Sequence, residues 1–77
     1  PSTTITFSLP ESGLTKLTVY NIIGQEIAIL VSDYLTAGIY KIPFNANSQN
    51  ARVTSGLYLY KLESKDFISI KKMLLIK

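Results

Sequence analysis

The sequence predicts an all-β fold, an antiparallel β-sandwich of six to seven strands, and three observations indicate it. Apolar and polar residues alternate with a period of two through most segments, as in strands with one buried face. Clusters of Gly, Pro, Asn and Ser separate these segments, and no segment has the 3.6-residue period of a helix. Hydrophobic residues make up 47% of the 77 residues, which supplies apolar surface for a core in a chain this short.

The first two strands are predicted from strict alternation. Residues 4–9 alternate between polar and apolar side chains, and residues 15–20 do so again. In the second segment Leu17 and Val19 share one face, and Thr18 and Tyr20 share the other. Residues 10–13, with the sequence Pro-Glu-Ser-Gly, form the turn between the two strands.

A hairpin connection and a third strand follow. The stretch 21–25 breaks the alternation, and Gly24 suits a position with positive φ, so we expect a turn there. Residues 26–31 are nearly all apolar, which predicts a strand covered on both faces. Residues 32–38 are more polar and end in Gly, and we interpret them as a crossing loop.

The middle of the chain combines an edge strand with a long polar loop. Residues 39–44 alternate again, but Pro43 cannot donate a backbone hydrogen bond and therefore indicates an edge strand or a bulge. Residues 45–55 are too polar for a strand and are predicted to form a loop, with a short helical turn near 48–52. Val53 is the one large apolar residue of this loop, and we expect it to fill part of the core.

The last two strands form a predicted hairpin. Residues 56–63 make the fifth strand, residues 64–66 a tight turn, and residues 67–77 a long final strand. The apolar residues of the final strand change phase along it. One face carries Phe67, Met73 and Leu75, and the other carries Ile68, Ile70, Leu74 and Ile76. Such a pattern predicts either a bulge or a strand covered on both faces.

Tyr58 suggests a more specific kind of sandwich. It lies two residues after Gly56, at the entry to the fifth predicted strand and just after the long loop. Immunoglobulin-like sandwiches carry a tyrosine at this place, the tyrosine corner, whose hydroxyl bonds back to upstream backbone. We therefore expect an immunoglobulin-like topology with this hydrogen bond.

Composition excludes several kinds of chemistry. The chain has no His and no Cys, so the common zinc sites, a Cys nucleophile and a Ser-His-Asp triad are excluded. No two acidic residues stand two positions apart on a strand, where they would be neighbours on one face. The acidic residues are Glu11, Glu26, Asp33, Glu63 and Asp66. We expect no catalytic residue, no metal site and no cofactor.

The charges of the chain are concentrated near its end. The net charge is +3 with a single Arg, which does not favour nucleic-acid binding. No apolar run approaches the roughly 18 residues of a membrane span. Five of the eight basic residues lie in the last 17 positions. They either protect an exposed strand edge from aggregation or form a docking patch for an acidic partner.

Five tyrosines offer a second candidate site. A cluster of exposed aromatic rings would suit carbohydrate binding. Aromatic residues are also common in strands and fill sandwich cores, and we favour this second interpretation. The tyrosines are Tyr20, Tyr34, Tyr40, Tyr58 and Tyr60.

Four stretches, taken together in this order and spacing, resemble a known family. They are PSTTITFSLPESG at 1–13, LTVYNIIGQEI at 17–27, SGLYLYKLE at 55–63 and KKMLLIK at 71–77. The chain is similar along its whole length to the C-terminal sorting domain of the type IX secretion system (type A, the Por secretion tail kind). That system belongs to Bacteroidetes and related bacteria.

The resemblance implies a single immunoglobulin-like domain spanning residues 1–77 at the C-terminus of a secreted protein. Such a domain is fused to an N-terminal cargo that reaches the periplasm and is then recognised by the outer-membrane translocon. A sortase-like protease commonly removes the domain, and the cargo becomes secreted or attached to the cell surface. The Asn-Pro that usually precedes Pro1 is missing, which predicts a cut at this point, and the loop at 45–55 is longer than in the family.

The resemblance also assigns roles to matched residues. The last strand is the candidate for recognition, with its edge open to β-augmentation and its lysines facing carboxylates of the translocon. The recognition residues are Lys71, Lys72, Met73 and Lys77, and the residues with a structural role are Gly24, Gly56 and Tyr58.

Other functions stay open. The chain could be a structural or adhesive module retained on an extracellular protein, or a subunit of a surface assembly that self-associates through the last strand. A carbohydrate-binding module and an enzyme are further alternatives, in that order.

Overall fold

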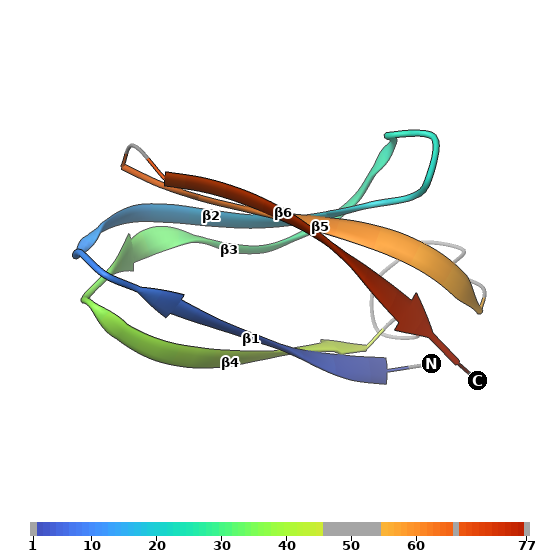
Figure 1. The fold of residues 1–77 in the computed structure, drawn as a ribbon, viewed down its shortest axis with the longest axis horizontal. Helices are drawn as coiled ribbons and strands as arrows, with labels where there is room; N and C mark the ends of the chain where they lie inside the picture. Colours follow the sequence, from blue (N-terminus) through green and yellow to red (C-terminus); the bar gives the residue numbers. More distant parts are fainter. Residues whose placement is uncertain (1, 46–54, 66, 77) are drawn as a thin grey trace.

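A computed structural model describes residues 2–45, 55–65 and 67–76. Within these ranges the strands are β1 (Ser2–Leu9), β2 (Gly13–Tyr20), β3 (Glu26–Leu35), β4 (Gly38–Asn45), β5 (Gly56–Ser64) and β6 (Phe67–Leu75). They form two antiparallel sheets, one of order β1-β4 and one of order β3-β2-β5-β6. Figure 1 shows the sheets as two facing layers. The predicted all-β sandwich is confirmed.

The order of the strands is that of an immunoglobulin-like sandwich. β2–β3 and β5–β6 are hairpins of the larger sheet, and the chain changes sheet after β1, β3 and β4. In immunoglobulin lettering, β1 and β4 correspond to strands B and E, and β3, β2, β5 and β6 to C′, C, F and G. β5 therefore takes the place of strand F, the strand that begins at the tyrosine corner.

The core lies between the two sheets and is built by the predicted alternation. Its buried side chains are Ile5, Phe7, Leu9, Leu17, Val19, Ala28, Phe44, Tyr58, Leu62 and Leu75. The rings of Phe7 and Tyr40 stack at a centroid distance of 5.5 Å across the β1–β4 pair. Each large side chain buried here contributes roughly 1.5–3 kcal/mol relative to exposure, so the core holds the two sheets together.

β4 is the predicted edge strand. In the described part of the chain it pairs with β1 alone, and Pro43 lies opposite Thr4. Proline has no backbone N–H to donate, and it is tolerated in an edge strand because one side of that strand forms no hydrogen bonds with a neighbouring strand. Tyr40, Ile42 and Phe44 point toward the core, as the alternation predicts.

β3 differs from its prediction at its end and on its outer face. The strand continues to Leu35, so the predicted crossing loop at 32–38 is wrong for its first half. The polar Ser32 and Asp33 stay in the strand because they pair with β2, and a backbone ladder needs no apolar side chains. Ile29 is 47% exposed, so β3 is not covered on both faces.

β6 contains neither the bulge nor the coverage on both faces that the change of phase in its apolar residues predicts. Its register with β5 runs without a shift from Ser64–Phe67 to Gly56–Leu75, so this pair has no bulge. The strand is also not covered on both faces, because the side chains on its outer face are 60% to 70% exposed. Those side chains are Ile68, Ile70, Leu74 and, just beyond the strand, Ile76. The apolar side chains on the outer face of β6 therefore form part of the molecular surface and do not belong to a second core.

Some predictions fall outside the described residues. These are the helical turn near 48–52 and the core-filling role of Val53. Asp66 in the predicted tight turn and Lys77 lie outside as well, whereas Lys65 is described and has a φ of 52°. The part of the chain that the structure describes contains no helix long and apolar enough to cross a membrane.

Candidate partner-binding surface

β6 lies at the edge of the larger sheet, where it pairs with β5 alone among the described strands. In an antiparallel ladder, alternate residues of an edge strand turn their N–H and C=O groups away from the neighbouring strand. The edge of β6 therefore offers backbone donors and acceptors to a strand from another chain.

Lys71 and Lys72 are both exposed, but they point to opposite faces because they are neighbours in a strand. Lys72 lies on the outer face, opposite Leu59 of β5. Lys71 lies on the inner side, where it lines the gap between the two sheets. The two lysines flank the edge of β6 instead of forming a single row, and Lys77 lies outside the described residues. Neither Lys71 nor Lys72 forms an ion pair with a described residue.

Met73 is on the inner face of β6, opposite Tyr58, and is half-buried against the core. Its contacts hold β6 on the sandwich. The residue therefore presents less of its side chain to a partner than the lysines beside it do.

A gap separates the edge of β6 from the edge of β1. It forms a cavity of about 110 Å³ lined by Thr6, Phe7, Ser8, Tyr60, Leu62, Phe67, Ser69 and Lys71. Each of β1 and β6 has a single partner strand among the described residues, so both present a backbone edge on this side. An added strand could pair with either edge and place alternate side chains into the gap.

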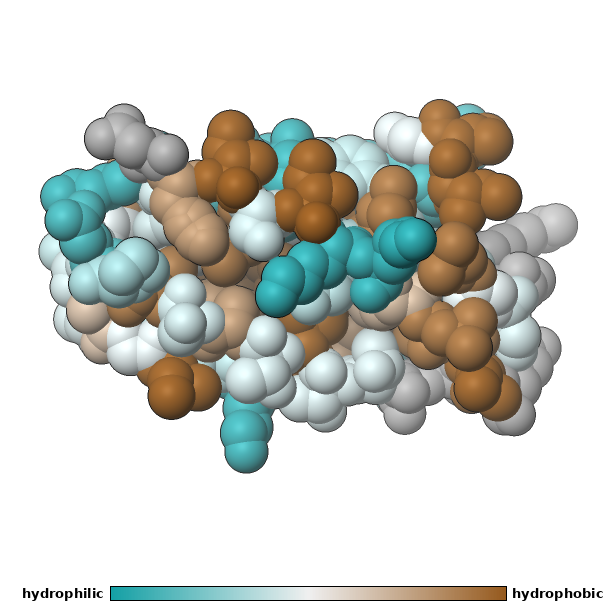
Figure 2. All heavy atoms as spheres, viewed as in Figure 1, coloured by the Kyte–Doolittle hydropathy of each residue, from teal (hydrophilic) through white to brown (hydrophobic). Residues whose placement is uncertain are grey.

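The outer face of β5 and β6 is unusually apolar. Leu57 is 46% exposed and pairs with Leu74, which is 61% exposed. Figure 2 shows hydrophobic residues gathered at the surface along this part of the molecule, with hydrophilic side chains between them. An apolar patch interrupted by lysines is typical of a surface that binds another macromolecule.

Lys61 is held by its neighbours on the same outer face. Its Nζ lies 5.4 Å from the centre of the Tyr20 ring and 3.5 Å from Glu63 Oε1. The Tyr20 hydroxyl, and then the Glu63 carboxylate, raise the pKa of Lys61 above its usual 10.5. Lys61 is therefore charged at neutral pH, with its charge engaged within the domain.

The residues with a predicted structural role lie in the β2–β3 turn (Gly24), at the first position of β5 (Gly56) and in the core (Tyr58). Gly24 has a φ of 87° and Gly56 a φ of 152°, conformations that side chains disfavour. Tyr58 is 7% exposed at the start of β5. The loop to which its hydroxyl is predicted to bond lies mostly outside the described residues, so the tyrosine corner stays a prediction.

The tyrosines do not form an exposed platform. Tyr34 is 58% exposed, whereas Tyr58 is buried and Tyr20, Tyr40 and Tyr60 are half-buried. Tyr40 and Tyr60 pack against the core, as the second interpretation of these residues expects.

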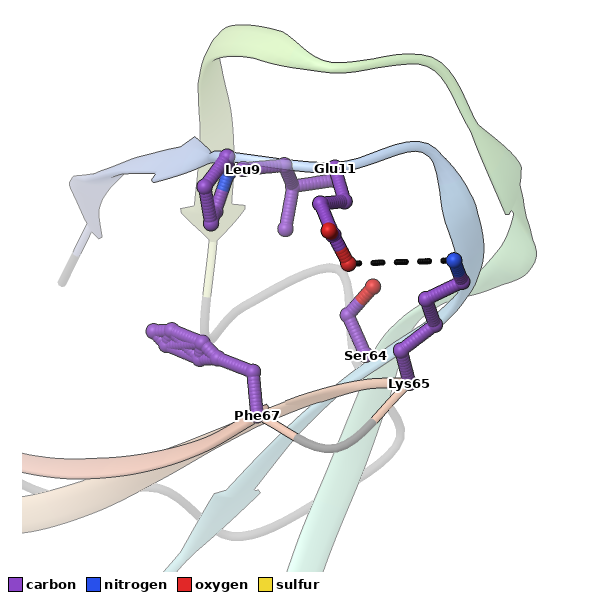
Figure 3. Close-up of a pocket in the computed structure, with 6 residues that line it drawn as sticks. Leu9, Glu11, Ser64, Lys65 and Phe67 are labelled. Carbon is purple, nitrogen blue, oxygen red and sulfur yellow. Dashed lines mark ion pairs between the residues drawn. The ribbon is translucent and has the colours of Figure 1, made fainter.

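A second cavity, of about 170 Å³, lies where the β1–β2 turn meets the β5–β6 hairpin (Figure 3). Lys65 Nζ lies 3.7 Å from Glu11 Oε2 across this cavity. The Ser64 hydroxyl is hydrogen-bonded to Thr15 Oγ1 at 3.0 Å. The ion pair joins the two turns, and the hydroxyl pair joins β2 to β5. Among the described residues that line the cavity, the one carboxylate is already paired with a lysine.

Comparison with protein-family models, with curated proteins and with solved structures gives no match for this chain. The sequence motifs and the surface of β6 are therefore the basis for a functional assignment.

Proposed function

We propose that the chain is a non-catalytic C-terminal sorting domain that directs an N-terminal cargo through the type IX outer-membrane translocon. The four sequence motifs support the family. The observation that carries the proposal is the surface of the last strand, which combines an accessible backbone edge, an apolar outer face and two lysines without a described ion pair.

Recognition would use the folded domain. A strand of the translocon pairs with the edge of β6, and its apolar side chains contact Ile70 and Leu74 on the outer face. Carboxylates on either side of that strand meet Lys72 on the outer face and Lys71 on the inner side. Because the two lysines flank the edge, they fix the position of the incoming strand from both faces.

The proposal also places the cargo in the cell. The cargo passes through the periplasm and becomes secreted or attached to the surface, with a sortase-like protease as a further partner.

A second candidate function is a structural or adhesive module that assembles with other copies. The gap between the edges of β1 and β6 favours it, because a strand from another molecule fits between two open edges. Under this function the purified domain forms larger species as its concentration rises, whereas a sorting domain stays at one size.

A transport assay tests the proposed function. The chain is attached to the C-terminus of a periplasmically exported fluorescent protein, in a bacterium with a type IX system. The controls are the fluorescent protein alone and a fusion lacking residues 71–77.

Export of the intact fusion to the surface or the medium, with both controls held in the periplasm, is the expected result. Retention of an intact, folded fusion in the periplasm would overturn the proposal. Export of the fusion lacking 71–77 would overturn recognition through β6.

A further inference from the structure

The turn between β2 and β3 exposes two adjacent isoleucines. Ile22 is 67% exposed and Ile23 is 74% exposed, and neither belongs to the core. In Figure 1 this turn projects beyond the sheet at one end of the molecule, and Figure 2 shows hydrophobic atoms at the same corner. The core gains nothing from these side chains, so folding does not explain them.

Hydrogen bonds fix the shape of this turn. Asn21 Oδ1 accepts from the backbone N–H groups of Ile23 at 3.1 Å and of Gln25 at 2.9 Å. The N–H of Gly24 donates to the carbonyl of Asn21, and the N–H of Asn21 donates to the carbonyl of Gln25, each at 3.0 Å. Asn21 Nδ2 also donates to Gln25 Oε1 at 2.8 Å. The isoleucines are therefore presented by a rigid frame.

The register of the sheet extends this apolar turn into a longer feature. Tyr20 pairs with Leu59, so the chain beyond Tyr20 runs toward the end of β5 that carries Leu57. Leu57 in turn pairs with Leu74 of β6. The exposed apolar residues at this end of the sheet, named here the apolar row, are Ile22, Ile23, Leu57, Leu74 and Ile76.

We propose that the apolar row is a further contact surface for the translocon, which continues from the outer face of β6 to the turn between β2 and β3. It inserts into an apolar groove of the partner protein, and a carboxylate at the border of that groove meets Lys72, which lies next to the row on the outer face. This inference rests on the proposed function.

The row suits a protein groove better than a lipid surface. Anionic lipid surfaces bind clusters of several basic residues. The isoleucines are framed by uncharged amides and a glycine, the nearest charge along the chain is the exposed carboxylate of Glu26, and Lys72 is the described lysine placed beside the row. A turn held by several hydrogen bonds fixes the direction of its side chains, which a shaped groove uses and a fluid bilayer does not need.

Paired substitutions in the transport assay test the proposal. Ile22→Ser with Ile23→Ser removes the tip of the row. Leu14→Ser with Ile39→Ser is the matched control, because both control side chains are 75% exposed and lie outside the row. Both variants should keep the melting temperature of the unmodified domain within a few degrees, because all four side chains are exposed.

Export of the Ile22→Ser/Ile23→Ser fusion should fall about tenfold or more, while the control fusion is exported like the unmodified one. Equal export of the two variants would overturn the inference and leave the proposed function intact. If the unmodified fusion itself is not exported, both proposals fail. Sedimentation with phosphatidylglycerol vesicles, lost in the Ile22→Ser/Ile23→Ser variant, would instead assign the row to a membrane and overturn the protein groove.

Discussion

Thr18 is the residue at which the fold departs most from simple burial rules. Its side chain is fully buried in β2, and its hydroxyl has no hydrogen-bond partner among the described residues. Thr15, on the same strand, is also buried, but its hydroxyl donates to the carbonyl of Gly13 and bonds to Ser64. Two threonines of one strand therefore contribute to stability with opposite signs.

Thr18→Val should raise the free energy of unfolding by about 1 kcal/mol, because valine has nearly the same shape and no hydroxyl to leave unpaired. Thr15→Val should lower it by about 1 kcal/mol, because it removes two hydrogen bonds and leaves Ser64 without this partner. Equilibrium unfolding in urea measures both. A loss of stability in Thr18→Val would show that its hydroxyl is satisfied in solution.

Among the elements, the turn at 21–25 depends most on a single side chain. Asn21 accepts two backbone N–H groups through Oδ1, whereas Gln25 contributes one exposed side-chain bond. Asn21→Ala should therefore lower the free energy of unfolding by about 1 kcal/mol, which corresponds to roughly 4–8 °C in melting temperature for a domain of this size.

Gln25→Ala is the control for the turn at 21–25, because it keeps the two hydrogen bonds that backbone N–H groups donate to Asn21 Oδ1. Its melting temperature should stay within about 2 °C of the unmodified domain. Equal effects of the two substitutions would contradict the role assigned to Asn21, and thermal unfolding followed by circular dichroism distinguishes the outcomes.

Alternation predicted most elements because it reports directly which face of a strand is buried. It predicted a half-buried strand over residues 4–9, whose buried side chains are Ile5, Phe7 and Leu9, and of the two alternatives indicated by Pro43 the edge strand is the one observed. It failed at 32–35, where the ladder with β2 holds polar residues in a strand. The alternation describes only the side chains of a segment. Whether its backbone continues in a strand also depends on the neighbouring strand, which the local sequence does not show.

The candidate surface was only partly predictable for a related reason. The sequence shows that β6 is apolar on both faces, but an apolar residue looks the same whether it meets a core or a partner outside the chain. Ile68 and Ile70 are exposed because they lie on the outer face of the larger sheet, which no described strand covers. The isoleucines at 22 and 23 had a signal, since a tight turn between Asn21 and Gly24 cannot bury two adjacent side chains.

On the scale of the whole molecule, the two faces of the larger sheet are used differently. Its inner face packs on β1 and β4 and contains the core. Its outer face exposes isoleucines and leucines between Lys16, Lys61 and Lys72. Soluble monomers rarely expose apolar patches beyond a few hundred Å² without a binding role, and interspersed lysines oppose aggregation. This distribution agrees with a domain that is recognised as a folded unit.

Charge reversal on β6 tests whether the domain is recognised through its last strand. Lys71→Glu with Lys72→Glu keeps Leu75 in the core and Met73 packed against it, whereas removal of residues 71–77 takes both away. Lys16→Glu with Lys41→Glu changes the net charge equally at two exposed lysines on other strands. Export of each fusion is measured as the fraction of fluorescence outside the periplasm.

Export should fall about tenfold or more for Lys71→Glu/Lys72→Glu and stay near the unmodified level for Lys16→Glu/Lys41→Glu, because only the first pair flanks the edge of β6. Equal export of the two variants, with both folded, would contradict recognition of the domain through its last strand.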